Sequence, residues 1–357
     1  MTHRKTAVLT AGLVFFTGAA IGVLRAQSRP ELADAGKPWT QKTPWGDPDL
    51  SGPWTSDDMR GIPRERPAEQ GIRRYLTDPE FAKRQSTDNE GRSREANRSG
   101  GFRNDTGTRT FRQTSLVVDP PNGQMPAFTP YAESRRATRD RGSFGEGPFD
   151  QTEDFTLYDR CITRGVIGSI LPVVYGNGNR ISQSPGYVTI TYEMIHDTRV
   201  IPLDGRPHLS PKVRQYLGDA RGHFEGNTLV VETTNFTDQT SVGGGNGNGP
   251  RHSEAMKLTE RLTRIDAQTL EYIVTVDDPK TYVQPFTLLL NLTTGRDNSV
   301  LPYECHEGNY MLKNTLSAER TEDRAIAADA QKGIVRVRKP IQGNINALPA
   351  AAPAEER

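Results

Sequence analysis

The chain has 357 residues, of which 34% are hydrophobic, and its 34 glycines and 25 prolines predict many turns and stretches without regular structure. This length suits one large domain or two of ordinary size. Because 45 basic residues nearly balance 44 acidic ones, the net charge is +1, which argues against a polyanionic partner, and we expect no binding to nucleic acid.

The N-terminus has the layout of a secretory signal peptide. His3, Arg4 and Lys5 form a short basic region, and an uncharged, largely apolar run from Ala7 to Leu24 follows. We therefore predict a signal peptide over residues 1–26 and a periplasmic or secreted location for the mature protein. An uncleaved N-terminal anchor is the alternative, because a run of this length can just span a bilayer. Once the signal is removed, the sequence predicts no membrane span.

Composition divides the rest of the chain into a polar linker, a loop-rich N-terminal segment that packs on the core, a β-rich core domain and a disordered tail. Polar and charged residues without hydrophobic periodicity mark the linker and much of the N-terminal segment, and the tail is rich in Ala, Pro and charged residues. In chain order these segments cover residues 27–42, 43–150, 151–320 and 321–357.

Regular structure is expected to be sparse in the N-terminal segment. A short helix is predicted from Asp78 to Gln85, where Asp-Pro gives a helix start, and another from Pro130 to Arg141, with proline in its first turn. The apolar run from Thr114 to Asp119 stops at two prolines and predicts a strand. Between Ser86 and Arg109 no helical or strand period persists, so we expect loop or disorder there.

The core domain is predicted to be mainly β. Runs of β-branched and aromatic residues alternate with turn sequences such as the Asp-Gly pair at 204–205 and the Gly-Asn pair at 226–227. Strands that follow one another through short turns form an antiparallel meander, so the expected fold is a calycin-like barrel or sandwich with short helices and long loops. The candidate strands are Arg180–Ser184, Tyr187–Leu203, Gly222–Thr234, Leu258–Ile265, Thr269–Val276, Gln284–Leu292 and Leu301–Cys305.

The chain contains two cysteines, Cys161 and Cys305. In an exported protein an even pair most simply forms a disulfide, because the compartment is oxidising. Closing so long a loop would stabilise the fold by about 4–5 kcal/mol in the chain-entropy model. A nucleophilic thiol and a metal ligand are the competing interpretations, since Cys305 is followed directly by His306 and Glu307.

Four motifs, at residues 46–54, 204–208, 222–236 and 277–279, resemble those of a large, functionally uncharacterised family of exported bacterial proteins. The likeness extends from Trp45 to about Arg320, and the family more often has Trp at the position of Phe224. The resemblance implies export and a β core, and it brings no catalytic residues to carry over. The motifs are GDPDLSGPW at 46–54, DGRPH at 204–208, GHFEGNTLVVETTNF at 222–236 and DDP at 277–279, of which the third is the most specific.

The first candidate site lies between Glu193 and Arg199. In an uninterrupted strand side chains alternate between faces, which would bury His196 among apolar neighbours and place Asp197 and Arg199 together on the polar face. A buried histidine is a natural general acid or base near neutral pH. The structural alternative is a core histidine bonded to a backbone carbonyl, beside a solvated row of charged residues.

The second candidate site is His306 with Glu307, which a Cys161–Cys305 bond would fix at one end of the barrel. An imidazole and a carboxylate side by side can share acid–base work. Adjacent strand residues point to opposite faces, however, and the chain has no His-x-His or His-Glu-x-x-His spacing, so a metal site is only weakly signalled. Motifs for nucleotide cofactors, serine hydrolases and covalent haem are absent from the sequence, and we expect no cofactor.

Two classes of function follow from these residues. In the first, the protein is an exported, periplasmic β-barrel enzyme that performs cofactor-free acid–base chemistry, as a lyase, hydratase, isomerase or hydrolase, on a small apolar or carbohydrate substrate. In the second, it is a non-catalytic periplasmic protein that binds a small molecule or glycan. Convergence of His196 and His306 in one pocket would favour the enzyme. The candidate catalytic residues are His196, Asp197, Arg199, His306 and Glu307.

Overall fold

The computed structural model describes residues 37–98, 107–136, 149–242, 251–295 and 300–338. The predicted signal peptide, most of the predicted linker and the end of the predicted tail lie outside these residues. None of the helices in the described part of the chain has the length and apolar character needed to cross a membrane.

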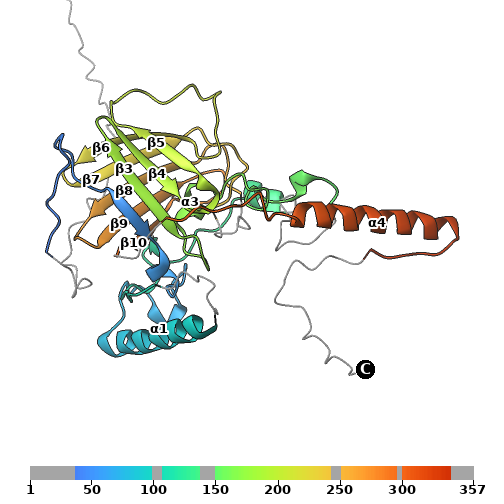
Figure 1. Ribbon diagram of the computed structural model, residues 1–357, viewed down its shortest axis with the longest axis horizontal. Helices are drawn as coiled ribbons and strands as arrows, with labels where there is room; N and C mark the ends of the chain where they lie inside the picture. Colours follow the sequence, from blue (N-terminus) through green and yellow to red (C-terminus); the bar gives the residue numbers. More distant parts are fainter. Residues whose placement is uncertain (1–36, 99–106, 137–148, 243–250, 296–299, 339–357) are drawn as a thin grey trace, which may run out of the picture.

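A single antiparallel sheet of ten strands curls into a nearly closed barrel (Figure 1), which confirms the prediction of a mainly β fold. The strands are hydrogen-bonded in the order β5-β4-β3-β1-β10-β9-β8-β7-β6, and β2 also pairs with β10. They are β1 Gly52–Thr55, β2 Val117–Asp119, β3 Gly178–Ser184, β4 Tyr187–Tyr192, β5 Thr198–Pro202, β6 Asp219–Glu225, β7 Thr228–Thr234, β8 Lys257–Arg264, β9 Thr269–Asp277 and β10 Phe286–Thr293.

The sheet is built from two meanders, β3–β5 and β6–β10, and from a strand of the N-terminal segment. β1 lies between β3 and β10 and pairs antiparallel with both. The N-terminal segment therefore supplies a strand of the sheet. The predicted meander of consecutive core-domain strands does not include this strand. The predicted strand at 301–305 is not formed, because these residues lead into a turn that begins at the disulfide-bonded Cys305.

The two ends of this strand order, β5 and β6, lie side by side without a ladder of hydrogen bonds. We call this junction the seam. Gly222 of β6 permits the close approach, since a Cβ atom there would lie 2.8 Å from Ile201 Cγ2 and 2.9 Å from Leu203 Cδ2. The barrel is closed at the seam by packing rather than by backbone pairing.

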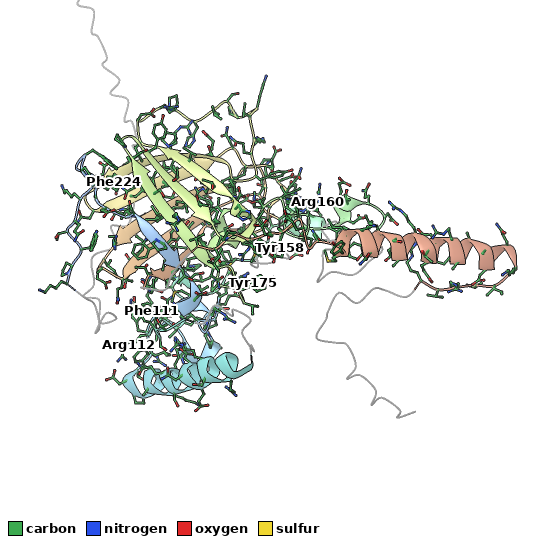
Figure 2. All side chains as sticks on the ribbon, viewed as in Figure 1. Phe111, Arg112, Tyr158, Arg160, Tyr175 and Phe224 are labelled. Atoms are coloured by element: carbon green, nitrogen blue, oxygen red, sulfur yellow. A yellow bond between two sulfur atoms is a disulfide. The ribbon has the colours of Figure 1, made fainter. Side chains whose placement is uncertain are left out.

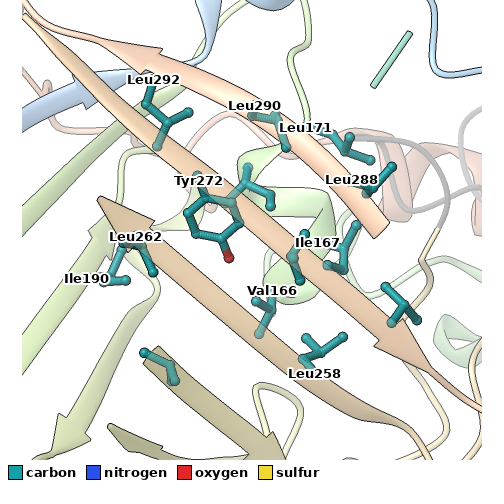
Figure 3. Close-up of a cluster of buried hydrophobic side chains, with 14 of the residues drawn as sticks. Val166, Ile167, Leu171, Ile190, Leu258, Leu262, Tyr272, Leu288, Leu290 and Leu292 are labelled. Atoms are coloured by element: carbon teal, nitrogen blue, oxygen red, sulfur yellow. The ribbon is translucent and has the colours of Figure 1, made fainter. Parts of the chain in front are cut away.

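Side chains fill the middle of the barrel. Alternate residues of β8, β9 and β10 point inward, as a period of two requires, and α3 contributes Val166 and Ile167 to the same cluster (Figure 3). Tyr272 of β9 is fully buried among them. The core is thus packed by the strands' own side chains, as in small barrels generally.

The helices differ from expectation mainly in length. α1 begins at Asp78 as predicted but continues to Arg98, so the first part of the segment that we expected to be loop is helical. Tertiary hydrogen bonds to the added part of the helix explain this. Arg92 Nη2 donates to the carbonyl oxygen of Arg109 at 2.5 Å, and the hydroxyl of Thr110 donates to Asp88 at 2.8 Å. The remaining helices are α2 Pro130–Arg136, α3 Gly165–Ile170, α4 Met311–Gln331 and the short 3₁₀ turns η1 Asp57–Met59, η2 Ala68–Gln70, η3 Thr152–Asp154 and η4 Met194–His196.

α4 projects from the side of the barrel (Figure 1) and overlaps the start of the predicted disordered tail. Leu316 packs against Phe149 and Phe155, which anchors the first half of the helix. Arg338 then folds back to pair with Glu319. The tail prediction is therefore wrong for residues 321–331, where alanines and charged residues extend an anchored helix rather than forming loop.

Candidate functional site

The predicted strand from Tyr187 to Leu203 is interrupted by η4, and this changes the face on which every later residue lies. Ile195 and His196 adopt left-handed backbone angles, with φ of 67° and 60°. Such angles are unfavourable for a β-branched residue such as isoleucine. After the kink, Arg199 and Ile201 point into the barrel, while Val200 is 55% exposed.

His196 is exposed, so the expectation that it is buried among apolar residues is wrong. Its Nε2 atom accepts a hydrogen bond from the backbone N–H of Tyr303 at 2.8 Å. The kink is the physical reason, because the alternation of faces that would bury residue 196 ends two residues earlier, at Met194.

Arg199 does not pair with Asp197 but points into the barrel interior. Its two terminal nitrogens bind the two carboxylate oxygens of Glu260 on β8, at 2.7 and 2.6 Å, and both side chains are buried. Thr233 accepts a further bond from Arg199 at 2.9 Å, and the hydroxyl of Tyr272 donates to Glu260. Burial alone would lower the pKa of Arg199, but Glu260, together with Tyr192 and Tyr272, outweighs burial and raises that pKa.

Asp197 stands at the seam, just before β5. Its Oδ2 atom accepts a hydrogen bond from the hydroxyl of Thr163. Burial raises the pKa of the Asp197 carboxyl, and the hydrogen bond from Thr163 only partly opposes this effect. Asp197 is thus a partly buried carboxyl whose pKa lies above its ordinary value.

A cleft of about 680 Å³ runs along the seam next to Asp197. One wall is formed by β5, the other by the start of β6 and the loop that precedes it. A volume of this size is typical of small-molecule sites. The seam cleft is lined by Ile162, Thr163, Asp197, Thr198, Arg199, Val200, Arg214, Gln215, Tyr216, Leu217, Gly218, Asp219, Ala220 and Thr237.

A second carboxylate, Asp219 of β6, lines the same cleft. It accepts hydrogen bonds from the backbone N–H of Leu209 at 2.9 Å and from Arg221 at 2.6 Å, and it contacts His208 Nδ1 at 3.0 Å. Burial acts to raise its pKa, but these hydrogen bonds together outweigh burial and lower it. The cleft therefore holds two carboxyl groups whose surroundings shift their pKa values in opposite directions.

Sequence reasoning identified Asp197 but missed Arg214 and Asp219. Arg214 pairs with Glu254 at 3.2 Å and donates to the carbonyl oxygen of the same residue at 3.1 Å, which holds the loop before β6 against the barrel. Neither residue belongs to a motif of known chemistry, and the contact between β5 and β6 that brings them near Asp197 is tertiary. No pattern in the sequence carried that information.

His306 and Glu307 are exposed in the turn that directly follows Cys305. Neither they nor His196 line the seam cleft. The disulfide itself is formed between Cys161 and Cys305, whose Cα atoms are 5.8 Å apart, as predicted. It ties the segment before α3 to the segment that leads into α4. Of the two candidate histidines, His196 binds the backbone of Tyr303 near the disulfide, and neither lies in the cleft.

The arrangement at the seam can bind a small polar molecule and exchange protons with it. Within the described ranges, no three His, Cys, Asp or Glu side chains gather in a way that could hold a metal ion. The carboxyl groups, hydroxyls and edge-strand backbone of the cleft are the chemically useful groups in it. Comparisons with protein-family models, with curated proteins and with solved structures give no match for this chain.

Proposed function

We propose that this protein binds a small polar molecule, of carbohydrate type, in the seam cleft. The observation that carries the proposal is a cleft of about 680 Å³ placed where the barrel lacks a hydrogen-bonded ladder. Edge strands present backbone donors and acceptors, and Thr163, Thr198 and Asp219 add polar side chains. A polar ligand suits such a lining better than an apolar ligand does. The middle of the barrel is filled by packed core side chains.

We also infer that the protein acts in an oxidising compartment, either the periplasm or the exterior. The Cys161–Cys305 disulfide supports this inference, because such bonds persist where thiols are not kept reduced. N-terminal sequencing of the protein from fractionated cells tests it. A mature chain that begins near residue 27 in the periplasmic or secreted fraction is the expected result, and an intact N-terminus in the cytosolic fraction would contradict it.

The binding proposal is tested by filling the cleft. Val200 lines it and is 55% exposed, so Val200→Trp adds a large ring without disturbing the core. We expect thermal shifts caused by sugars in a mono- and oligosaccharide panel to disappear in this variant, while the unliganded melting temperature stays near that of the wild type.

Val213→Trp is the matched control, since Val213 is 47% exposed and lies outside the cleft lining. It should keep the response to sugars. If no sugar stabilises the wild-type protein, or if Val200→Trp responds like the wild type, the seam cleft is not a carbohydrate site.

A second candidate function is cofactor-free acid–base catalysis in the same cleft, with Asp197 as the acid. It is favoured by the opposite pKa shifts of Asp197 and Asp219, because such a pair separates an acid from a base. A general acid must be protonated to act, so turnover should be lost as the pH rises through the pKa of Asp197. That pKa lies above the usual aspartate value of about 3.9.

Asp197→Asn tests this role on any sugar that binds. We expect binding to be kept and turnover to fall by a factor of about 100 or more, the scale of a positioned general acid. Asp204→Asn is the control, because Asp204 pairs with Arg206 in an exposed turn away from the cleft. Binding without turnover in the wild type would leave the protein as a binding protein alone.

A further inference from the structure

Arg164 is a buried arginine whose guanidinium has no hydrogen-bond partner among the residues that the structure describes. The side chain is 3% exposed, and Nε, Nη1 and Nη2 are all buried without a partner. A guanidinium carries five N–H donors, and leaving them unsatisfied away from water is costly. Arg199 shows the contrast, because it is equally buried but binds Glu260 with both terminal nitrogens.

Three tyrosines, rather than a carboxylate, interact with the charge of Arg164. Its Cζ atom lies 5.9 Å from the centre of the Tyr158 ring, and Tyr175 and Tyr303 complete the group. Burial lowers the pKa of Arg164 to about 10, which still leaves it charged at neutral pH. The cation is therefore held in an aromatic surrounding that does not neutralise it.

The tyrosines connect Arg164 to the surface. Tyr175 interacts through its side chain with Tyr158 and with Tyr303, and the rings of Tyr175 and Tyr303 stack with centroids 6.3 Å apart. Tyr175 is 44% exposed. Figure 2 shows Tyr158 and Tyr175 on the side of the barrel from which α4 projects. Exposure therefore falls from Tyr175 at the surface, through the half-buried Tyr158 and Tyr303, to the buried guanidinium of Arg164.

The backbone around this group is fixed in unusual conformations. Cys161, Ile195 and His196 are three of the four non-glycine residues with positive φ in the described chain. Cys161 is held by the disulfide, and His196 binds the backbone of Tyr303. Left-handed residues cost free energy and cluster at functional sites, where the surrounding structure keeps them in place.

We propose that Arg164, together with the hydroxyl groups of Tyr158, Tyr175 and Tyr303, forms a binding site for an oxyanion, the carboxylate or phosphate group of a small molecule. A guanidinium binds such a group through two parallel N–H donors, and tyrosine hydroxyls add further donors. The bound anion supplies the countercharge that the described part of the chain does not provide to Arg164. This site is separate from the seam cleft, whose lining includes none of these four residues.

The test uses the full mature chain with two probes, sodium benzoate as an aromatic carboxylate and inorganic phosphate, at constant ionic strength against chloride. Titration calorimetry and thermal melts are recorded for the wild type, Arg164→Met and Arg164→Lys. We expect saturable binding to the wild type and a loss of affinity of at least about tenfold in Arg164→Met. Arg164→Lys should bind with intermediate affinity, because an ammonium keeps the charge but lacks the fork.

Arg160→Met is the matched control, since Arg160 (Figure 2) lies on the same segment. Its side chain pairs with Glu153 at 3.6 Å. It should bind both probes as the wild type does. Without a probe, Arg164→Met should melt at the same temperature as the wild type or higher, because it removes an uncompensated buried charge.

Every outcome of these titrations and melts either supports the oxyanion site or overturns it. Binding of benzoate alone, or of phosphate alone, supports the site and identifies the class of ligand. If the wild type binds neither probe, or if Arg164→Met and Arg164→Lys bind them as tightly as the wild type, there is no oxyanion site. A markedly lower melting temperature, or failure to fold, in both Arg164 variants would show a structural role and would also overturn the proposal.

Discussion

At the scale of single residues, Arg199 shows how far a side chain's role depends on where the strand turns. Strand alternation in the sequence predicts that Arg199 lies on the surface beside Asp197, two positions earlier. The structure instead places Arg199 inside the barrel, bound to Glu260 and surrounded by the hydroxyls of Thr233 and Tyr272. A charge at such depth is tolerated only because its partner and the hydroxyls satisfy it.

Removing one partner of this pair should be far more harmful than removing both. We expect Arg199→Met to lower the free energy of unfolding by about 3–5 kcal/mol, because Glu260 is left as an unpaired buried charge. The double variant Arg199→Met with Glu260→Leu should recover most of that loss. Urea denaturation of the three proteins measures both values.

Arg261→Met is the control for charge removal at the surface, where Arg261 pairs with Glu225 and both side chains are largely exposed. It should cost about 1 kcal/mol or less. A double variant no more stable than Arg199→Met would show that the buried pair stabilises the core by itself.

At the scale of elements, the seam between β5 and β6 determines both the closure of the barrel and the place of the cleft. The two strands meet through side chains, and at Gly222 they leave no room for a Cβ atom. A side chain there would push against Ile201 and Leu203 rather than fit between them. The cleft thus exists where the barrel is packed but not hydrogen-bonded.

Gly222→Val should therefore separate the strands at the seam. Overpacking of this kind costs about 1–3 kcal/mol, so we expect the variant to melt at a lower temperature than the wild type. Relative to the wild type, amide exchange should speed up more in β5 and β6 than in β8 and β9. Gly308→Val is the control, because an added Cβ there meets no atom within 4 Å. Equal stability of Gly222→Val and the wild type would mean that the seam is looser than its packing indicates.

At the scale of the whole molecule, segments far apart in the chain hold the barrel together. β1 of the N-terminal segment joins the two meanders, and the Cys161–Cys305 bond ties the region before α3 to the region before α4. Gln113 of the N-terminal segment adds a further link, because its Oε1 atom accepts a hydrogen bond from Asn291 Nδ2 of β10 at 3.1 Å. The regions that we separated by composition are therefore parts of one connected structure.

The sequence by itself determined the mainly β fold, most strand positions and the disulfide, because hydrophobic alternation, turn residues and an even cysteine pair are local or compositional signals. Only the tertiary structure decided the insertion of β1, the length of α1, the kink at Ile195 and His196, and the grouping of Arg164 with three tyrosines. Each of these depends on contacts between residues distant in the chain. Such contacts can override a local period, as when the kink moves Arg199 to the interior and His196 to the surface.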